Sequence, residues 1–322
     1  MNPLDPPALE AIRAARKRID GLARRTPLLP LQTKEEAPAE IHVKLENLQP
    51  IGSFKLRGAG NKMRAARREE LAGGVWTASA GNMAQGVAWV AREMGLRCRV
   101  VIPDHAPRTK IEAIHRLGAE TVAVPFARWW QILMEHSYPG LDGLFLHPVS
   151  DPVVQAGNGT IGLEILEDLP GVETVVVPFG GGGLSCGIAA ALRALKPEVK
   201  ILAAEVETAA PLTAALEAGE PREIDYTPSF VDGIGGRSVL AEMWPLARRL
   251  LDGTVVVSLE EVAAAIRLLA EQNRVIAEGA GAAPVAAALS GRAGNGKTAC
   301  VVSGGNLEPS KLAAILKGEL PA

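Results

Sequence analysis

Strand-length runs of apolar residues recur along almost the whole chain, and segments with helical periodicity separate them. Several of these runs, such as residues 175–179 and 299–302, are apolar throughout instead of alternating with polar residues. Continuous apolar runs are typical of parallel strands that helices cover on both faces. The alternation of strands and helices therefore predicts an α/β protein, either a doubly wound fold or a barrel.

The pattern also places the other elements. Apolar and polar residues alternate at 41–45, which predicts a strand with one exposed face. An amphipathic helix is expected near residues 8–22, and Ser258 with Glu261 forms a capping box that opens another helix. Further strands are expected at residues 75–77, 99–102, 121–124, 144–146, 174–177, 201–204 and 254–257. Aromatic residues cluster at 126–143, where the pattern allows either an irregular connection or an active-site lid.

Composition excludes several classes of function. The 322 residues carry a net charge of −2, which offers no basic surface for nucleic acid or an anionic membrane. No apolar run is long enough to span a membrane, and the N-terminus lacks the pattern of a signal peptide. Cys98, Cys186 and Cys300 lie far apart and are odd in number, which favours reduced thiols in a cytoplasmic protein.

Two motifs resemble known sites but stand in the wrong context. Residues 291–298 match the P-loop pattern, yet a helical segment precedes them and a strand follows, the reverse of the order that a P-loop requires. Residues 183–187 match the nucleophile elbow of hydrolases, but all five histidines precede Ser185, whereas those enzymes place their histidine after the serine. We therefore expect neither a nucleotide site nor a serine nucleophile.

A run of four glycines, Gly180 to Gly183, has the right context for phosphate binding. It follows a predicted strand and precedes a helix that starts near Leu184. Glycines let the backbone approach an anion closely, and the first amides of a helix donate to phosphate oxygens. Such loops after strands favour doubly wound sheets. Glu205 ends the next strand, as a ribose-binding acid would, so a nicotinamide-dependent dehydrogenase is an alternative, although the G-x-G-x-x-G spacing is missing.

Lys55 lies in a segment that carries a stronger signal. A turn with Pro50 and Gly52 leads to Phe54 and Lys55, which open a helix. Ser-Ala-Gly-Asn at 79–82, the glycine run, and Ser-Gly-Gly-Asn at 303–306 follow in order. Together these four motifs resemble the fold-type II enzymes that use pyridoxal 5′-phosphate (PLP), and most closely the serine/threonine dehydratases, or threonine ammonia-lyases, whose relatives include serine racemase. The resemblance covers roughly residues 20–315.

The resemblance implies an architecture. Two doubly wound domains would hold PLP in the cleft between them. Residues 1–72 and 152–322 would form the large PLP-binding domain, and residues 73–151 a small inserted domain. A homodimer or a higher homo-oligomer is the arrangement that this family implies.

It also implies roles for individual residues. Lys55 would be the catalytic residue, bound to the cofactor as a Schiff base. Phe54 would lie against the pyridine ring, Asn82 would bind the phenolic oxygen, and Ser303 would contact the ring nitrogen. The implied cofactor-binding residues are Phe54, Lys55, Asn82, Gly180, Gly181, Gly182, Gly183, Leu184 and Ser303. The implied substrate-binding residues are Ser79, Ala80, Gly81, Asn82, Met83 and Glu278.

The chemistry of these residue types agrees with elimination. A lysine that forms a Schiff base must be neutral, and burial lowers its pKa. A serine at the pyridine nitrogen stabilises a protonated ring less than a carboxylate would, which favours rapid loss of a β-substituent over transamination. The predicted reaction is α,β-elimination of water and ammonia from threonine, serine or a bulkier 3-substituted serine, with a 2-oxo acid as product. Another β-elimination, or racemisation, is the alternative within the family.

Several positions depart from the family pattern. Serine racemases carry a second serine where this chain has Ala80, so racemisation is not expected. Relatives that bind a divalent cation have an aspartate where this chain has Pro211, which leaves Glu205 alone, and no metal site is predicted. Met83 replaces a histidine found in many relatives. Met83 either borders the substrate and favours an apolar β-substituent, or fills a packing gap. If Trp129 and Trp130 border the same cleft, they would add apolar surface.

Overall fold

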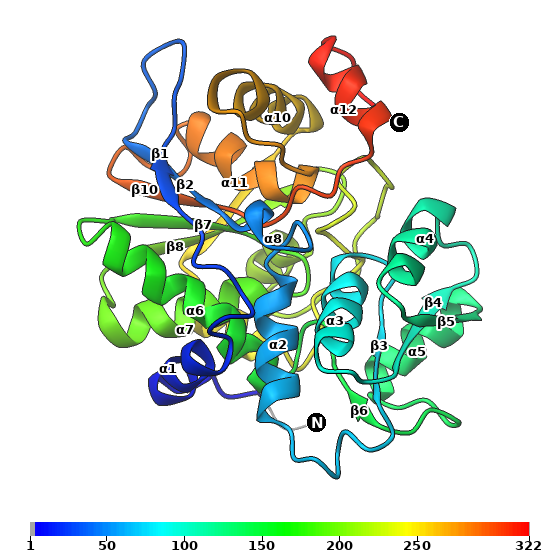
Figure 1. Cartoon of the computed structure of the whole chain (residues 1–322). Helices are drawn as coiled ribbons and strands as arrows, with labels where there is room; N and C mark the ends of the chain where they lie inside the picture. The colour runs from blue at the N-terminus through cyan, green and yellow to red at the C-terminus, as the bar shows by residue number, and fades with distance from the viewer. Residues whose placement is uncertain (1–3, 322) are drawn as a thin grey trace.

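The structure, a computed structural model, describes residues 4–321 and contains two sheets of different size (Figure 1). The elements of the larger part are α1 (Leu9–Arg18), β1 (Leu28–Pro30), β2 (Ile41–Leu45), the 3₁₀ turn η1 (Glu46–Leu48), α2 (Lys55–Ala65), α6 (Pro152–Asp168), β7 (Thr174–Pro178), α7 (Gly183–Leu195), β8 (Lys200–Val206), α8 (Pro211–Ala218), α9 (Trp244–Leu250), β9 (Gly253–Val257), α10 (Leu259–Asn273), α11 (Gly279–Leu289), β10 (Thr298–Val302) and α12 (Pro309–Leu316). The smaller part consists of β3 (Val75–Ala78), α3 (Asn82–Glu93), β4 (Cys98–Pro103), α4 (Arg108–Arg116), β5 (Glu120–Val124), α5 (Phe126–Glu135) and β6 (Leu144–Phe145).

Parallel pairing dominates both sheets. The large sheet has the strand order β1-β2-β10-β7-β8-β9, and the small sheet has the order β5-β4-β3-β6. Every pair of neighbouring strands is parallel except β1 with β2. Parallel neighbours need crossover connections, and the helices of these connections cover the faces of the sheets. The prediction of doubly wound sheets is therefore confirmed, and the barrel is excluded.

Alternate residues of each strand pack on opposite faces of the large sheet. Val176 belongs to a core shared with α10 and α11, whereas Val175 and Val177 belong to a core shared with α6 and α7. Figure 1 shows α10 and α11 above this sheet and α6 and α7 below it. Since both faces are covered, both sets of side chains are apolar, which explains the continuous runs in the sequence.

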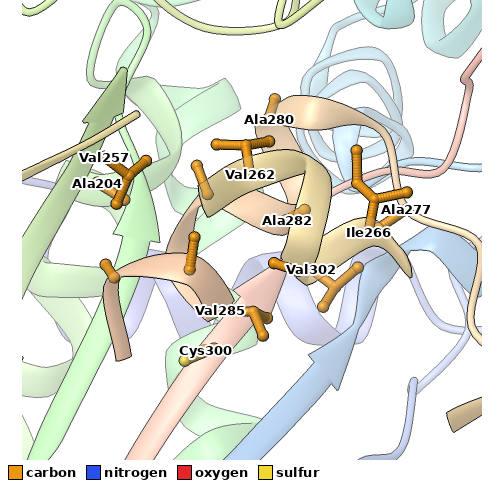
Figure 2. Packing of buried hydrophobic residues seen from close by; sticks show 14 of the residues in the cluster. Ala204, Val257, Val262, Ile266, Ala277, Ala280, Ala282, Val285, Cys300 and Val302 are labelled. Atoms are coloured by element: carbon orange, nitrogen blue, oxygen red, sulfur yellow. The ribbon is translucent and has the colours of Figure 1, made fainter. Parts of the chain in front are cut away.

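Small side chains let the helices approach the upper face closely. Alanines of α11, including Ala282, pack with Val262 and Ile266 of α10 and with Val302 of β10 (Figure 2). The predicted capping box at the start of α10 is confirmed, with Ser258 and Glu261 bonded to each other's backbone. Alanine is the best helix former and leaves little volume between helix and sheet, so this face is dense without many aromatic residues.

The small sheet repeats this arrangement. Val75 and Val100 face a core with α3 and α4, whereas Trp76 and Val101 face a core with α5. Residues of α2 also pack into the first of these cores, including Leu56 and Met63. Helix α2 therefore contributes to the packing beside the small sheet as well as beside the large one. Within the described residues, no helix has the length and apolar character needed to cross a bilayer.

Some predictions about elements were wrong. The antiparallel edge strand β1 was not predicted, because three residues ending in Pro30 give no periodic signal. Strand β2 is not half-exposed, since its polar residue Lys44 is fully buried. The aromatic segment is not an irregular connection at its start, because residues 126–135 form helix α5. The N-terminal helix also ends earlier than expected, at Arg18.

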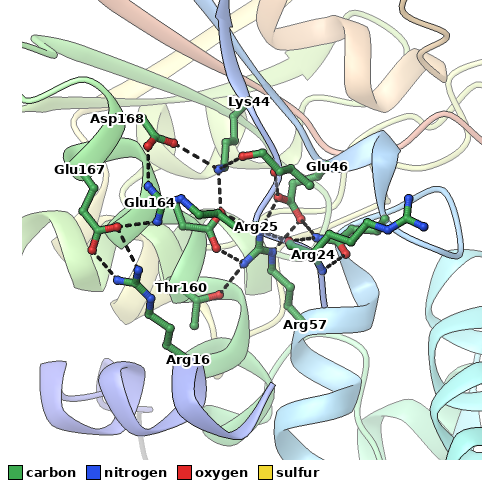
Figure 3. A network of polar contacts seen from close by, with 12 residues as sticks. Arg16, Arg24, Arg25, Lys44, Glu46, Arg57, Thr160, Glu164, Glu167 and Asp168 are labelled. Carbon is green, nitrogen blue, oxygen red and sulfur yellow. Dashed lines mark hydrogen bonds and ion pairs between the residues drawn. The ribbon is translucent and has the colours of Figure 1, made fainter. Parts of the chain in front are cut away.

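A buried network of charges explains why Lys44 is inside (Figure 3). The guanidinium of Arg57, only 1% exposed, donates to both carboxylate oxygens of Glu46 at 2.8 Å and to those of Glu164 at 2.6 and 2.9 Å. Lys44 Nζ lies 2.6 Å from Glu164. Burial by itself would raise the pKa of Glu46, but the Arg57 charge lowers it below its ordinary value. The network joins η1, α2 and α6, so paired charges replace apolar contacts at this junction.

We predict that Arg57→Ala strongly destabilises the protein, because it leaves two carboxylates buried with too few donors. Removing one partner of a buried ion pair costs about 3–5 kcal/mol. The matched control is Arg16→Ala. Arg16 pairs with Glu167, which lies on α6 like Glu164, but both side chains of this pair are more than 40% exposed. Exposed pairs contribute about 0–1 kcal/mol. Urea denaturation measures the free energy of unfolding of both variants. Equal losses of stability in the two would contradict the importance of burial.

Candidate active site

The candidate site lies at the carboxyl ends of strands from both sheets. Ser79 follows β3, Gly180 follows β7 and Ser303 follows β10. They border one cavity of about 330 Å³, a size within the range of ligand pockets. All of the residues expected to bind cofactor and substrate line it: Phe54, Lys55, Ser79, Ala80, Gly81, Asn82, Met83, Gly180, Gly181, Gly182, Gly183, Leu184, Glu278 and Ser303. The structure thus brings together motifs from distant parts of the sequence.

Hydrogen bonds to distant segments of the chain hold Lys55 at the wall of the cavity. The backbone N–H of Phe54 donates to the carbonyl of Ser303 at 3.0 Å, which ties the start of α2 to the end of β10. Lys55 Nζ donates to the carbonyl of Pro148 at 2.9 Å and lies 5.1 Å from the centre of the Phe54 ring. Burial lowers the pKa of Lys55 to about 8, against a smaller opposing effect of Glu278. The amine is therefore easily deprotonated, as a nucleophile requires.

Close packing and backbone conformation both require glycine at positions of the glycine loop. A Cβ at position 181 would lie 2.6 Å from the Val149 side chain, and one at position 183 would lie 2.7 Å from the Val149 carbonyl oxygen. Gly182 has φ +92° and is the N-cap of α7. Gly180 differs, because its Cβ would meet nothing closer than 3.5 Å. The loop has room at Gly180 and is pressed against Val149 at Gly181 and Gly183.

The segment Ser79 to Asn82 is another loop of the cavity that precedes a helix. It connects β3 to α3, and α3 begins at Asn82. The backbone N–H of Gly81 donates to Ser79 Oγ at 3.2 Å, and a Cβ at Gly81 would have no heavy atom within 4 Å. The first amides of a helix carry partial positive charge and have no partner inside the helix. The loop can therefore receive a carboxylate.

Glu278 and Asn82 meet across the cavity. Asn82 Nδ2 donates to Glu278 Oε1 at 2.8 Å, and Asn82 Oδ1 accepts from Asn306 at 2.8 Å. An amide nitrogen has two N–H donors, so the second remains able to bind a cofactor oxygen. Burial, and next the charge of Asp232, raise the pKa of Glu278 to about 7. Glu278 can therefore hold or release a proton near neutral pH.

These residues fit PLP. The cradle of glycine amides at the start of α7 suits its phosphate, and the half-buried Lys55 amine, which is neutral at mildly alkaline pH, suits its aldehyde. Ser303, 3% exposed, offers a neutral hydroxyl in the same cavity. Glu205, by contrast, is fully buried and its carboxylate accepts from the backbone N–H groups of Leu212 and Thr213, both at 2.8 Å. Glu205 caps α8 and is therefore not free to bind a ribose, as the nicotinamide-dependent alternative would require.

The predicted apolar wall is only partly as expected. Met83 borders the cavity but is 1% exposed and packs in the core beside the small sheet. Trp129 lines the cavity, and its Nε1 donates to the Val101 carbonyl at 3.2 Å. Trp130 is 43% exposed and is not among the cavity residues, so of the two tryptophans Trp129 contributes to the wall. Phe126 stacks on Trp129 with ring centres 5.7 Å apart and completes the wall.

Several cavity residues were missed from the sequence. Pro148 and Val149 follow β6, and their position after a parallel strand was the signal that could have identified them. Lys110 of α4 donates to Asp232 at 2.7 Å and both border the cavity. Single charges in a helix and a loop give no local pattern. Both rejected motifs are structural: Ser185 Oγ donates to the Gly182 carbonyl, and residues 291–298 connect α11 to β10.

Comparison with known proteins places the chain in a family. The family described as "Pyridoxal-phosphate dependent enzyme" matches residues 19–304. L-threonine ammonia-lyase of Thermotoga maritima is 40% identical over 312 residues, which cover 96% of this chain and 78% of that protein. The catabolic L-threonine dehydratase TdcB of Escherichia coli K12 is 36% identical over 317 residues and covers 96% of both chains.

Solved structures agree with the sequence relatives. Maize serine racemase superposes with a TM-score of 0.85 at 30% identity, covering 97% of both chains. A processed threonine deaminase, isoform 2 of Solanum lycopersicum, superposes with a TM-score of 0.83 at 30% identity, covering 98% of this chain and 96% of that one. Since the family match spans most of the chain and several relatives exceed 30% identity, the chain belongs to the pyridoxal-phosphate-dependent enzymes.

Proposed function

We propose that the chain is a PLP-dependent dehydratase, or ammonia-lyase, that converts a β-hydroxy-L-amino acid to a 2-oxo acid and ammonia by α,β-elimination. Candidate substrates are threonine, serine and bulkier 3-substituted serines. The observation that carries the proposal is that Lys55, which is half-buried, borders the same cavity as the glycine loop 180–183 and the loop 79–82, which are suited to a phosphate and a carboxylate. The threonine ammonia-lyase and threonine dehydratase relatives support the reaction type.

The cavity residues have separate roles in the proposed reaction. The amides of Ala80, Gly81 and Asn82 orient the substrate carboxylate at the start of α3. Lys55 Nζ, with its lowered pKa, takes the proton from the substrate Cα. PLP, when bound, supplies the electron sink that makes this proton acidic. Ser303 donates a hydrogen bond without a negative charge, which supports expulsion of the β-hydroxyl over slower carbanion chemistry.

Racemisation requires a second acid or base on the opposite face of the substrate. Ala80 lines the cavity where serine racemases carry a serine, and a methyl group cannot transfer a proton. We therefore propose elimination without racemisation. No residue of the Glu205 region is assigned to a divalent cation, because both of its carboxylate oxygens already accept hydrogen bonds from α8.

We further propose a division into a large domain (residues 1–72 and 152–322) and a small domain (residues 73–151). The four-stranded sheet supports it, because its strands run from Val75 to Phe145. Closure of the small domain would bring the carboxylate loop onto the substrate.

We also propose a cytoplasmic homodimer or higher homo-oligomer. The free, buried thiols of Cys98, Cys186 and Cys300 support a reducing compartment.

The first test of this proposal is a product assay. The purified protein should be yellow and should release 2-oxobutanoate and ammonia from L-threonine, with little D-enantiomer. Lys55→Ala should lower kcat/KM at least roughly a thousandfold, because the cofactor link and the base disappear together. Lys34→Ala is the control, since Lys34 is exposed and pairs with Glu271 outside the cavity. A colourless protein that binds NAD would contradict the proposal.

A second test addresses the protonation of Lys55. Competitive acetylation of the cofactor-free protein, followed by mass spectrometry, should show Lys55 titrating near pH 8, below the ordinary 10.5 of lysine. Glu278→Gln should lower this pKa further, because the Glu278 charge stabilises the ammonium form, while glutamine keeps an acceptor for Asn82. Titration at 10.5, or an increase in the variant, would contradict the role of burial.

A third test addresses the substrate. Pro103, Phe126 and Trp129 give one wall of the cavity an apolar surface, so a substrate with a larger apolar β-substituent should exceed L-serine in kcat/KM, with 3-hydroxyaspartate poor. The preference should be roughly ten- to a hundredfold. Trp129→Leu should reduce it, whereas Trp130→Leu, the matched control, should not. Met83→His should also shift the substrate preference toward L-serine, because Met83 borders the cavity and histidine is more polar than methionine.

A further inference from the structure

His147 is a buried polar residue close to the cavity. It belongs to none of the sequence motifs and has no role in the proposed reaction. It follows β6 and is 3% exposed. Its Nδ1 accepts hydrogen bonds from the backbone N–H groups of Val149 at 3.2 Å and Ser150 at 2.8 Å, and the Ser150 hydroxyl lies 2.8 Å away. A histidine that accepts from the next turn of its own chain fixes the shape of that turn, here residues 147–150.

This turn touches both parts of the proposed site. The Pro148 carbonyl accepts the hydrogen bond from Lys55 Nζ at 2.9 Å. Val149 lies directly behind the glycine loop, where a Cβ on Gly181 or Gly183 would overlap it. Consecutive residues of one short segment thus meet the lysine and the glycine loop. A change in the turn would therefore displace two neighbours at once.

The protonation of the ring suits this role. Since Nδ1 accepts, the single proton of the neutral ring lies on Nε2. Within residues 4–321, Nε2 has no hydrogen-bond partner. Burial, and next the neighbouring His136, lower the pKa of His147 to about 3. The ring is therefore neutral at physiological pH, and Nδ1 stays an acceptor.

A metal site is the competing interpretation of the same residues. His136, His147 and Glu242 place potential ligand atoms within 4.8 Å of one another. However, His147 Nδ1 already receives two backbone donors, and the two rings are stacked with centres 4.3 Å apart and planes 26° apart. A metal ion lies in the plane of each imidazole that binds it, and nearly parallel stacked rings do not meet at such a point. The arrangement supports a packed and hydrogen-bonded pair instead.

We infer that His147 is a positioning residue, whose Nδ1 holds the turn 147–150 so that Pro148 aligns Lys55 and Val149 supports the glycine loop. The inference rests on the proposed function for the roles of Lys55 and the glycines. It adds a residue that is not among those lining the cavity and acts through its neighbours. His136 stacks on one face of the ring and lies 3.3 Å from Glu242.

A matched pair of variants tests it. In His147→Asn, the side-chain oxygen occupies about the position of Nδ1 and can accept the same two bonds. In His147→Gln, the amide reaches toward the position of Nε2 instead. Both variants are polar and both lose the stacking on His136, so they differ mainly in the bonds to the turn. We expect Gln to weaken PLP binding roughly ten- to a hundredfold, because two backbone donors lose their partner, and Asn to stay within about threefold of the original.

The measurements are the dissociation constant of PLP, the absorbance of the bound cofactor, and kcat/KM, with the melting temperature as a check on folding. Equal losses in both variants would show that ring packing matters and the Nδ1 bonds do not, which overturns the inference. Unchanged binding in both would overturn it as well. Competitive acetylation of Lys55 in the cofactor-free protein gives a separate readout: Asn should keep the original profile and Gln should change it. If the original protein fails to bind PLP, the proposed function fails, while this readout still decides the role of His147.

Discussion

The buried contact of Arg57 with Glu46 and Glu164 supports the rest of the site. Arg57 lies two residues after Lys55 on α2, and its guanidinium joins that helix to η1 and α6. Helix α6 in turn packs against α7, which the glycine loop opens. The lysine and the glycines are therefore connected through one buried ionic junction. Because a different orientation of α2 would leave buried charges without partners, the junction opposes such a change.

Parallel strand pairing explains why the functional loops converge. In a parallel sheet, all carboxyl ends lie at one edge, so loops that follow different strands meet there. The loops after β3, β7 and β10 come from distant parts of the sequence and from both sheets, yet they border one cavity. The fold supplies the meeting point, and the residues of each loop supply the chemistry.

Burial then sets the protonation of the groups at this point. It lowers the pKa of Lys55 to about 8 and raises the pKa of Glu278 to about 7. It also keeps His147 neutral, with a pKa of about 3. The same physical cause thus acts in opposite directions on amine and carboxyl groups, because in each case it disfavours the charged form. Lys55 and Glu278 can therefore move protons near neutral pH without a large net charge in the cavity.

Local patterns were sufficient to predict the α/β class and most strand positions, because these depend on periodicity. The family resemblance carried by four short motifs implied the majority of the cavity residues. Which polar residues are buried depends instead on tertiary packing. Lys44 has the pattern of an exposed residue in an alternating strand but is inside, since it pairs with Glu164 on a helix far along the chain. Asn82 with Glu278, and Lys55 with Pro148, are likewise pairs between distant segments. Such pairings, and the burial that shifts each pKa, arise only when the chain folds back on itself, so no local pattern encodes them.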